Sequence, residues 1–367
     1  MNKTETHEDH RIRVLIADDS FFIRTYLMEH FRLSPHIEVV GMASNGEEVI
    51  ALAQKLHPDV ITMDYNMPGK NGLEATAAIM LGGRPLPAVI MLSAFAGDEG
   101  ARVRHMLEES GAHVIAKPSG EVSLDIEKIA GRIVAKIEEI GRIEMRIREA
   151  YSRLSHITHK RRPVVYHGGT ALRAVVVIGA STGGPPLVEH VLSTLKPEMG
   201  IGVVIAQHMS KYFTELFAER LDRVTEFSVR EASEHTILTP GTAFVIPGGH
   251  ALSILTPAAN KSIDTEFTIT PLPMPHHEDA IDRTMTAIAE SYGPRVFGVL
   301  LSGMGADGAS GIGAIKVHNG VTITQDPTTA IVASMPEHAL HGGKIDVVLE
   351  VEKISEWILE HIEERFS

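Results

Sequence analysis

Short, almost continuous runs of apolar residues recur along this chain, and helical patterns separate most of them. Strands that are apolar on both faces are typical of parallel sheets covered by helices on each side. We therefore expect α/β domains built on doubly wound parallel sheets. The runs are RVLIAD, EVVGMAS, DVITMD, AVIMLSA and HVIAK in the N-terminal part, and RAVVVIGA, IGVVIAQ, FSVREAS, FGVLLSG, VTITQD and IDVVLE in the C-terminal part.

The two groups of runs predict two domains. A chain of 367 residues exceeds the size of a usual single hydrophobic core. We place the first domain at residues 11–120 and the second at residues 173–367, with residues 121–172 as a helical linker. In the second domain, the stretch TPGTAFVIPGGHALSIL has proline and glycine between short alternating runs. This pattern predicts a small antiparallel insertion in an otherwise parallel sheet.

The linker shows a seven-residue repeat of large apolar residues, with charged residues in most of the places between them. Such a repeat fits an amphipathic helix that lies on a neighbouring domain. It also fits a coiled coil that pairs two copies of the chain as a homodimer, and the sequence leaves both alternatives open. The repeat consists of Ile126, Ile133, Ile140, Ile147 and Leu154.

Charge and composition argue against several classes of protein. A formal net charge of −13 does not suit a partner such as nucleic acid or an anionic membrane surface. The chain has no cysteine, which excludes disulfides, cysteine nucleophiles and thiolate metal sites. The stretch MNKTETHEDH does not resemble a signal peptide, and no apolar run is long enough to cross a bilayer. We therefore expect a cytoplasmic protein without direct membrane insertion.

Polar residues follow the predicted strands of the first domain. Asp18 and Asp19 follow the first strand, Asp64 ends the third, Ser93 ends the fourth and Lys117 ends the fifth. Because the carboxyl ends of parallel strands meet at one edge of a sheet, these side chains should converge. Three neighbouring carboxylates repel one another unless a hard cation such as Mg²⁺ lies between them. A carboxylate beside Mg²⁺, with a hydroxyl and a lysine nearby, is suited to accepting a phosphoryl group.

The motifs ADDS, MDYNMPGKNGL, LSA and KPSG at these spacings resemble the response-regulator receiver domain, which has a flavodoxin-like fold. The resemblance implies that Asp64 is the phosphoacceptor and that it holds Mg²⁺ together with the two aspartates after the first strand. It also implies that Ser93 and Lys117 form the receiver switch. The chain departs from the family at Val114, where an aromatic residue is usual. This departure argues against an aromatic rotamer switch.

In the second domain, a predicted buried strand ends within the stretch VVVIGASTGG, and Ser181 follows it directly. We expect the helix that begins near Pro185 to point unpaired amides and the positive end of its dipole at this position, which favours an oxyanion. A serine hydroxyl becomes nucleophilic when a base such as histidine removes its proton. The strand IGVVIAQ leads to His208, and the strand FGVLLSG leads to Asp307 in the loop GMGADG. We therefore predict a Ser–His–Asp triad at one edge of the second sheet.

Each of these residues also has a simpler interpretation. Taken alone, Ser181 is more typical of a helix cap, His208 of a surface loop and Asp307 of a turn, and it is their joint placement that favours a triad. The loop at residues 303–308 also spells GxGxxG, the pattern of a dinucleotide-binding turn, and Asp326 ends the next strand where a ribose-binding acid would stand. Against this alternative, Asp307 inside the loop would repel a pyrophosphate, and no basic residue lies nearby in the sequence.

The motifs IGASTGG, AQHM, FVIPGGH, LLSGMGADGA, ITQDP and SMPEHAL, behind a receiver domain, closely resemble the chemotaxis protein-glutamate methylesterases. The resemblance covers both domains and implies a Rossmann-like esterase domain. It implies hydrolysis of glutamate methyl esters on the cytoplasmic helices of chemoreceptors, and in many members deamidation of receptor glutamines. The chemotaxis histidine kinase would be the phosphodonor, and the esterase reaction would need no cofactor.

The active-site roles of this family map onto Ser181 as the nucleophile, His208 as the general base and then acid, and Asp307 as the group that orients the histidine. Backbone amides near Thr182 and Met304 are candidates for the oxyanion hole. In the family, the unphosphorylated receiver covers the esterase cleft, and phosphorylation loosens that packing. Two alternatives of other classes are a receiver-regulated dinucleotide-binding oxidoreductase and a non-catalytic adaptor that only binds receptors.

Overall fold

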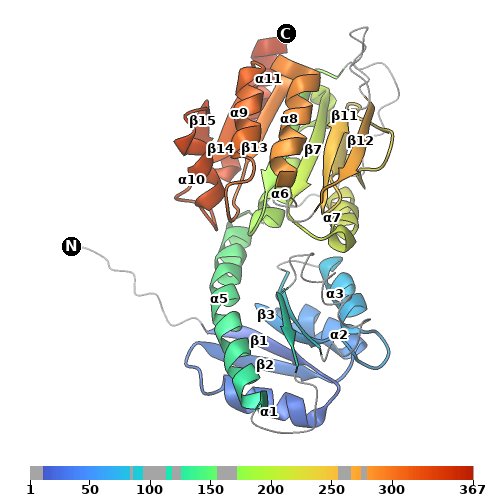
Figure 1. The fold of residues 1–367 in the computed structure, drawn as a ribbon, viewed down its shortest axis with the longest axis vertical. Helices are drawn as coiled ribbons and strands as arrows, with labels where there is room; N and C mark the ends of the chain where they lie inside the picture. Colours follow the sequence, from blue (N-terminus) through green and yellow to red (C-terminus); the bar gives the residue numbers. More distant parts are fainter. Residues whose placement is uncertain are drawn as a thin grey trace, which may run out of the picture. The chain divides into compact units, whose positions relative to one another are not determined.

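Figure 1 shows a computed structural model of the chain, which divides into two compact units, Met1–Glu149 and Ala150–Ser367. None of the helices in the described ranges combines the length and the apolar character that a bilayer crossing requires. The structure describes residues 11–82, 86–93, 113–117, 125–154, 172–254, 266–273 and 279–366.

The first unit contains a five-stranded parallel sheet in the order β2-β1-β3-β4-β5. This is the flavodoxin-like strand order, in which the order of the strands reverses between β1 and β3 and leaves a crevice at the carboxyl ends of the strands. The predicted doubly wound parallel domain is therefore confirmed here. The elements are β1 (Ile12–Ala17), α1 (Phe21–Phe31), β2 (Ile37–Ala43), α2 (Gly46–Leu56), β3 (Val60–Asp64), α3 (Gly72–Met80), β4 (Ala88–Ser93) and β5 (His113–Ala116).

The sheet of the first unit has a separate core on each face. Successive residues of β1 point to opposite faces, as the two-residue period of a strand requires. Ile16 packs in the core that contains Phe31 of α1, whereas Leu15 packs in the core that contains Val49 of α2 and Ala75 of α3. This packing holds the carboxyl end of β1 rigidly next to that of β3.

The long helix α5 (Asp125–Leu154) follows the five strands, and its apolar face packs within the chain. The helix passes so close to Ile12 that a Cβ at Gly141 would lie 2.5 Å from the Ile12 side chain. This packing favours the interpretation of an amphipathic helix on a neighbouring domain and gives no support to a homodimer formed through the linker. The heptad residues with described side chains are all buried, namely Ile133, Ile140, Ile147 and Leu154.

The second unit contains a seven-stranded sheet in the order β15-β14-β13-β6-β7-β10-β8, and its paired neighbours run parallel. Every residue of β6 and β7, at the centre, is buried. The prediction of a second parallel-sheet domain is therefore confirmed. The strands of this sheet are β6 (Ala174–Ala180), β7 (Ile201–Gln207), β8 (Ser228–Glu231), β10 (Thr242–Val245), β13 (Val296–Leu300), β14 (Val321–Gln325) and β15 (Val347–Leu349).

Helices cover both faces of this sheet. Side chains of α6, α7 and α11 share one core with the sheet, and side chains of α8, α9 and α10 share the other. The helices are α6 (Gly184–Thr194), α7 (Lys211–Val224), α8 (Ala280–Tyr292), α9 (Ala309–Val317), α10 (Ser334–His341) and α11 (Val351–Phe366), with short 3₁₀ turns η2 (Pro197–Met199) and η4 (Gly293–Arg295).

The predicted small antiparallel insertion is present, but it is built partly from other strands than the sequence suggested. β11 (His250–Ile254) pairs antiparallel with β12 (Glu266–Pro271), which pairs with β9 (Thr236–Ile237). β10 was predicted in this insertion, yet it lies in the main sheet, parallel to both β7 and β8. The reason is burial on both faces: Ala243, Phe244 and Val245 are all buried, as in an inner parallel strand.

Candidate functional sites

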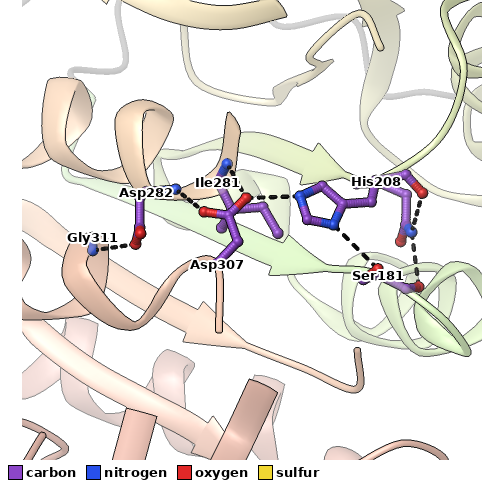
Figure 2. Close-up of polar contacts among 7 residues, drawn as sticks. Ser181, His208, Ile281, Asp282, Asp307 and Gly311 are labelled. Atoms are coloured by element: carbon purple, nitrogen blue, oxygen red, sulfur yellow. Dashed lines mark hydrogen bonds and ion pairs between the residues drawn. The ribbon is translucent and has the colours of Figure 1, made fainter. Parts of the chain in front are cut away.

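Three loops at the carboxyl ends of neighbouring strands carry the predicted triad (Figure 2). Ser181 directly follows β6, and His208 directly follows β7, its partner strand. Asp307 lies in the loop between β13 and α9, and β13 pairs with the other edge of β6. The strand order β13-β6-β7 therefore brings together three residues that are far apart in the chain.

The imidazole of His208 lies between the other two side chains. Its Nδ1 is 3.2 Å from Oγ of Ser181, and its Nε2 is 2.7 Å from Oδ2 of Asp307. A carboxylate beside Nε2 favours the tautomer with the proton on Nε2, which leaves the Nδ1 lone pair free to accept the serine proton. This arrangement can activate a serine hydroxyl.

The first turn of α8 holds the carboxylate of Asp307. The amide of Ile281 donates to Oδ2 at 2.9 Å, and the amide of Asp282 donates to Oδ1 at 2.8 Å. These amides belong to the positive end of the helix dipole, which stabilises an anion. Both oxygens of Asp307 are thus bonded, and in the tautomer with the proton on Nε2 of His208, Oδ2 also accepts a hydrogen bond from that nitrogen.

The helix after Ser181 offers fewer free amides than the sequence analysis predicted. α6 begins at Gly184, whose amide donates to the Ser181 carbonyl at 2.9 Å. The next two residues, Pro185 and Pro186, have no N–H. The first three positions of α6 therefore supply the dipole but no spare hydrogen-bond donor. Any oxyanion donors must come from the loops beside the helix.

Two loop amides near Ser181 are unused. Within the described part of the chain, the amides of Thr182 and Met304 have no hydrogen-bond partner. The two loops are joined by Ser302, whose hydroxyl donates to the Thr182 carbonyl at 2.9 Å. Gly303 allows the close approach, since a Cβ there would lie 2.8 Å from the Ser181 Cβ.

Gln207 is a residue of this site that the sequence analysis missed. Its Nε2 donates to the carbonyl of Ser181 at 2.9 Å and to the carbonyl of His208 at 3.1 Å. The side chain is buried, so it ties the serine loop and the histidine loop together out of contact with water. The signal in the sequence was a glutamine directly beside His208, at the end of a strand that is otherwise apolar.

The GxGxxG loop does not offer a free pyrophosphate site. The amide of Gly311 donates to Oδ1 of Asp282 at 2.6 Å, and the amides of Gly308 and Ser310 also bond to this carboxylate. Asp282 therefore occupies the position of an anion at the start of α9. Asp326 accepts hydrogen bonds within its own turn. The dinucleotide alternative is not favoured.

In the first unit, carboxylate oxygens of Asp18, Asp19 and Asp64 lie within 4.8 Å of one another at the carboxyl ends of β1 and β3. Lys117 follows β5, and its Nζ is 2.6 Å from Oδ2 of Asp18 and 2.8 Å from Oδ1 of Asp64. Ser93 is the last residue of β4 and pairs with Ala116 of β5. Oxygen donors at this spacing suit a hard divalent cation.

Burial and charge act against each other in this acidic site. Burial raises the pKa of Asp64 to about 6, with Lys117 lowering it and the charges of Asp18 and Asp19 raising it further. Burial also disfavours the charge of Lys117, but the two carboxylates outweigh this effect and raise the pKa of the ammonium group. The three carboxylates outnumber the one lysine, so the negative charge of the site favours the binding of a cation.

Val114, the departure from the receiver pattern, lies in β5 and packs partly buried in the core of one sheet face. A valine side chain there cannot perform the reorientation of an aromatic ring.

An acidic crevice in one α/β unit and a Ser–His–Asp arrangement in a second are typical of a response regulator with a hydrolase output domain. The comparisons with known proteins agree. The response regulator receiver domain family model matches residues 14–127, and the CheB methylesterase family model matches residues 176–358.

Relatives match nearly the whole length of this chain. A protein-glutamate methylesterase/protein-glutamine glutaminase of Pyrococcus horikoshii is 36% identical over 96% of this chain and 94% of its own. A second, of Carboxydothermus hydrogenoformans, is 36% identical over 95% and 99%. The solved CheB methylesterase catalytic domain of Thermotoga maritima is 32% identical and covers 51% of this chain and 98% of its own, with a TM-score of 0.48. This chain belongs to the family of protein-glutamate methylesterases that carry a receiver domain.

The pKa of Asp64 predicts a pH-dependent cation affinity. Between pH 7 and pH 5 the ionised fraction of a carboxyl with a pKa of about 6 falls from roughly nine tenths to one tenth, so the affinity for Mg²⁺ should fall about tenfold. Calorimetric titration of the protein with Mg²⁺ across this range measures the change. The variant Asp64→Asn should bind Mg²⁺ weakly with a flatter pH profile, and a wild-type affinity that is equal at both pH values would contradict the assignment.

Proposed function

We propose that this chain hydrolyses glutamate methyl esters on the cytoplasmic helices of chemoreceptors and releases glutamate and methanol. In this proposal Ser181 is the nucleophile, His208 the general base and acid, and Asp307 the group that orients the imidazole. The observation that carries the proposal is that His208 contacts Ser181 through one ring nitrogen and Asp307 through the other. The names of the relatives support the substrate class.

Acylation begins when Oγ of Ser181 attacks the ester carbonyl while Nδ1 of His208 takes the hydroxyl proton. The carbonyl oxygen becomes an oxyanion, for which the unused amides of Thr182 and Met304 are the proposed donors. The carbon–oxygen bond to the methoxy group then breaks, and the imidazolium gives its proton to the departing oxygen. Methanol leaves, and the glutamyl side chain remains esterified to Ser181.

Deacylation repeats the same steps with water. His208 takes a proton from the water as its oxygen attacks the acyl carbon, and the proton then returns to Oγ of Ser181 as the acyl bond breaks. The receptor side chain leaves the site as a glutamate carboxylate, and the serine is restored. In both half-reactions, the carboxylate of Asp307 stabilises the positive charge on the imidazolium, because Nε2 donates to it at 2.7 Å.

The same site can act on a primary amide. A glutamine side chain presents a carbonyl of the same shape, and His208 can protonate the leaving amine to release ammonia. The relatives are named as glutaminases as well as methylesterases, so we propose receptor glutamine deamidation as a second reaction.

The proposed regulator of this activity is phosphorylation of Asp64 by the chemotaxis histidine kinase. Asp18, Asp19 and Asp64 would hold Mg²⁺, which supplies positive charge to offset the incoming phosphoryl group. Lys117 already contacts two of these carboxylates and is placed to bond a phosphoryl oxygen, with Ser93 at the end of the neighbouring strand.

In this proposal residues 11–120 form the receiver, residues 121–172 the linker and residues 173–367 the esterase, and the protein acts in the cytoplasm. An acyl phosphate regulates the esterase by shifting the balance between an inhibited and an active state. A differential stability of about 3 kcal/mol would change the occupancy of the active state by roughly two orders of magnitude.

Replacement of the proposed nucleophile tests the esterase. Ser181→Ala should lower methanol release from methylated chemoreceptor by at least about 10³-fold, because no other group forms the acyl intermediate. Ser193→Ala is a matched control, since the hydroxyl of Ser193 only bonds a carbonyl within α6. Methanol release that persists in Ser181→Ala would contradict the assignment and would favour a different nucleophile.

Removal of the phosphoacceptor tests the regulation. Because Asp64 belongs to the first unit and not to the esterase site, Asp64→Ala should keep the unstimulated rate of methanol release but lose stimulation by a phosphodonor. Glu38→Ala, which removes an exposed carboxylate of β2, should keep both. If Asp64→Ala were still stimulated, phosphorylation of Asp64 would not be the switch.

A further inference from the structure

The helices α8 and α9 exchange their N-terminal capping groups. A carboxylate or hydroxyl at the N-cap position usually bonds the first free amides of a helix. Here the N-cap of α9 is Gly308, which has no side chain, and the N-cap of α8 makes no side-chain capping bond. Asp307, just before α9, instead bonds the first turn of α8, and Asp282, in the first turn of α8, bonds the first turn of α9.

The exchange depends on a close approach of the two helices. A Cβ at Gly311 would lie 2.6 Å from the Cβ of Met285, so this crossing requires glycine at that position. The amide of Gly311 then donates to Asp282 at 2.6 Å. The start of α9 is thereby fixed to α8 only a few residues after Asp307.

Other contacts also hold the loop that carries Asp307, since the amide of Gly305 donates to the hydroxyl of Ser334 at 2.8 Å. Gly305 and Gly308 adopt positive φ angles of 92° and 95°, a backbone region that glycine enters at no steric cost. Glycine also gives the loop many alternative conformations. The bond between Asp282 and the start of α9 adds to these contacts in favouring one of them, in which Oδ2 of Asp307 meets Nε2 of His208 at 2.7 Å.

Two carboxylates in this small region repel each other, and each is compensated by the N-terminus of a helix. Burial raises the pKa of Asp282, the amide of Gly311 lowers it and the charge of Asp307 raises it further. The helix amides therefore stabilise the negative charges of Asp282 and Asp307, as a basic side chain would do at another site.

We propose that Asp282 is a positioning residue of the esterase site, which acts through the start of α9 to hold Asp307 against His208. The inference rests on the proposed function, because it assigns Asp282 a part in the same reaction. Asp282 touches neither the substrate nor His208, so its effect must appear in the rate of the chemical step and not in substrate binding.

The variant Asp282→Ala tests this role through kcat and KM for methanol release from methylated receptor. A loss of about 10²-fold in kcat with unchanged KM is expected, because a displacement of about 1 Å in a catalytic group has an effect of this size. Asp282→Asn keeps an oxygen that can accept the Gly311 amide and should restore most of kcat. Asp282 also lines a cavity of about 520 Å³, so truncation does not leave a closed void. Glu290→Ala, at an exposed position of the same helix and cavity, is the matched control.

A double-mutant cycle separates positioning from a general loss of structure. If Asp282 acts through Asp307, the variant Asp282→Ala/Asp307→Ala should be no slower than Asp307→Ala alone. The inference would be overturned if Asp282→Ala lowered kcat by the same factor in the wild-type protein and in Asp307→Ala. It would also be overturned if Asp282→Ala alone had the wild-type kcat. Should Asp282→Ala fail to fold, Asp282→Ser takes its place, because the shorter side chain cannot reach the Gly311 amide as the carboxylate does.

The two proposals fail in different ways. If the wild-type protein releases no methanol, the proposed function is wrong and the inference falls with it. If the wild-type and Glu290→Ala proteins are active and Asp282→Ala matches them in kcat, the proposed function stands and only the positioning role of Asp282 is overturned.

Discussion

Both candidate sites depend on one geometric constraint, which is that parallel strands of a sheet end at the same edge. In the second unit, the adjacent strands β13, β6 and β7 deliver Asp307, Ser181 and His208 to that edge. In the first unit, β1, β3 and β5 deliver the aspartates and Lys117 in the same way. The hydrophobic cores on both faces of each sheet fix the strands and thereby the positions of the polar groups at the edge.

The two units neutralise their buried carboxylates by different means, and the difference suits their proposed roles. Fixed backbone amides of α8 hold Asp307, which suits its proposed role as a constant partner for His208. In the first unit a flexible lysine side chain contacts Asp64, and burial still raises the pKa of this carboxyl to about 6. A cation or a phosphoryl group can change that balance, which is a property of a switch and not of a rigid catalytic site.

Sequence reasoning could predict the strands and the residues that follow them, because strands buried on both faces leave continuous apolar runs. It placed β10 in the wrong sheet, since the partner of a short strand is decided by tertiary packing. The free amides predicted at the start of α6 are missing, because Pro185 and Pro186 have no amide hydrogen. The proposed role of Asp282 could not be predicted from a pattern in the sequence, because its partner at Gly311 comes close only where α8 and α9 cross.

The central claim is that His208 receives the proton of Ser181 on Nδ1 while its Nε2–H is held by Asp307. Nitrogen-15 NMR of the histidine side chains, with His208 assigned from its absence in His208→Gln, reads the tautomer directly. In the resting protein at mildly alkaline pH, we predict a protonated Nε2 and an unprotonated Nδ1, and a loss of this preference in Asp307→Ala. A proton resident on Nδ1 of the wild-type protein would contradict the account, because that nitrogen could not then accept the serine proton.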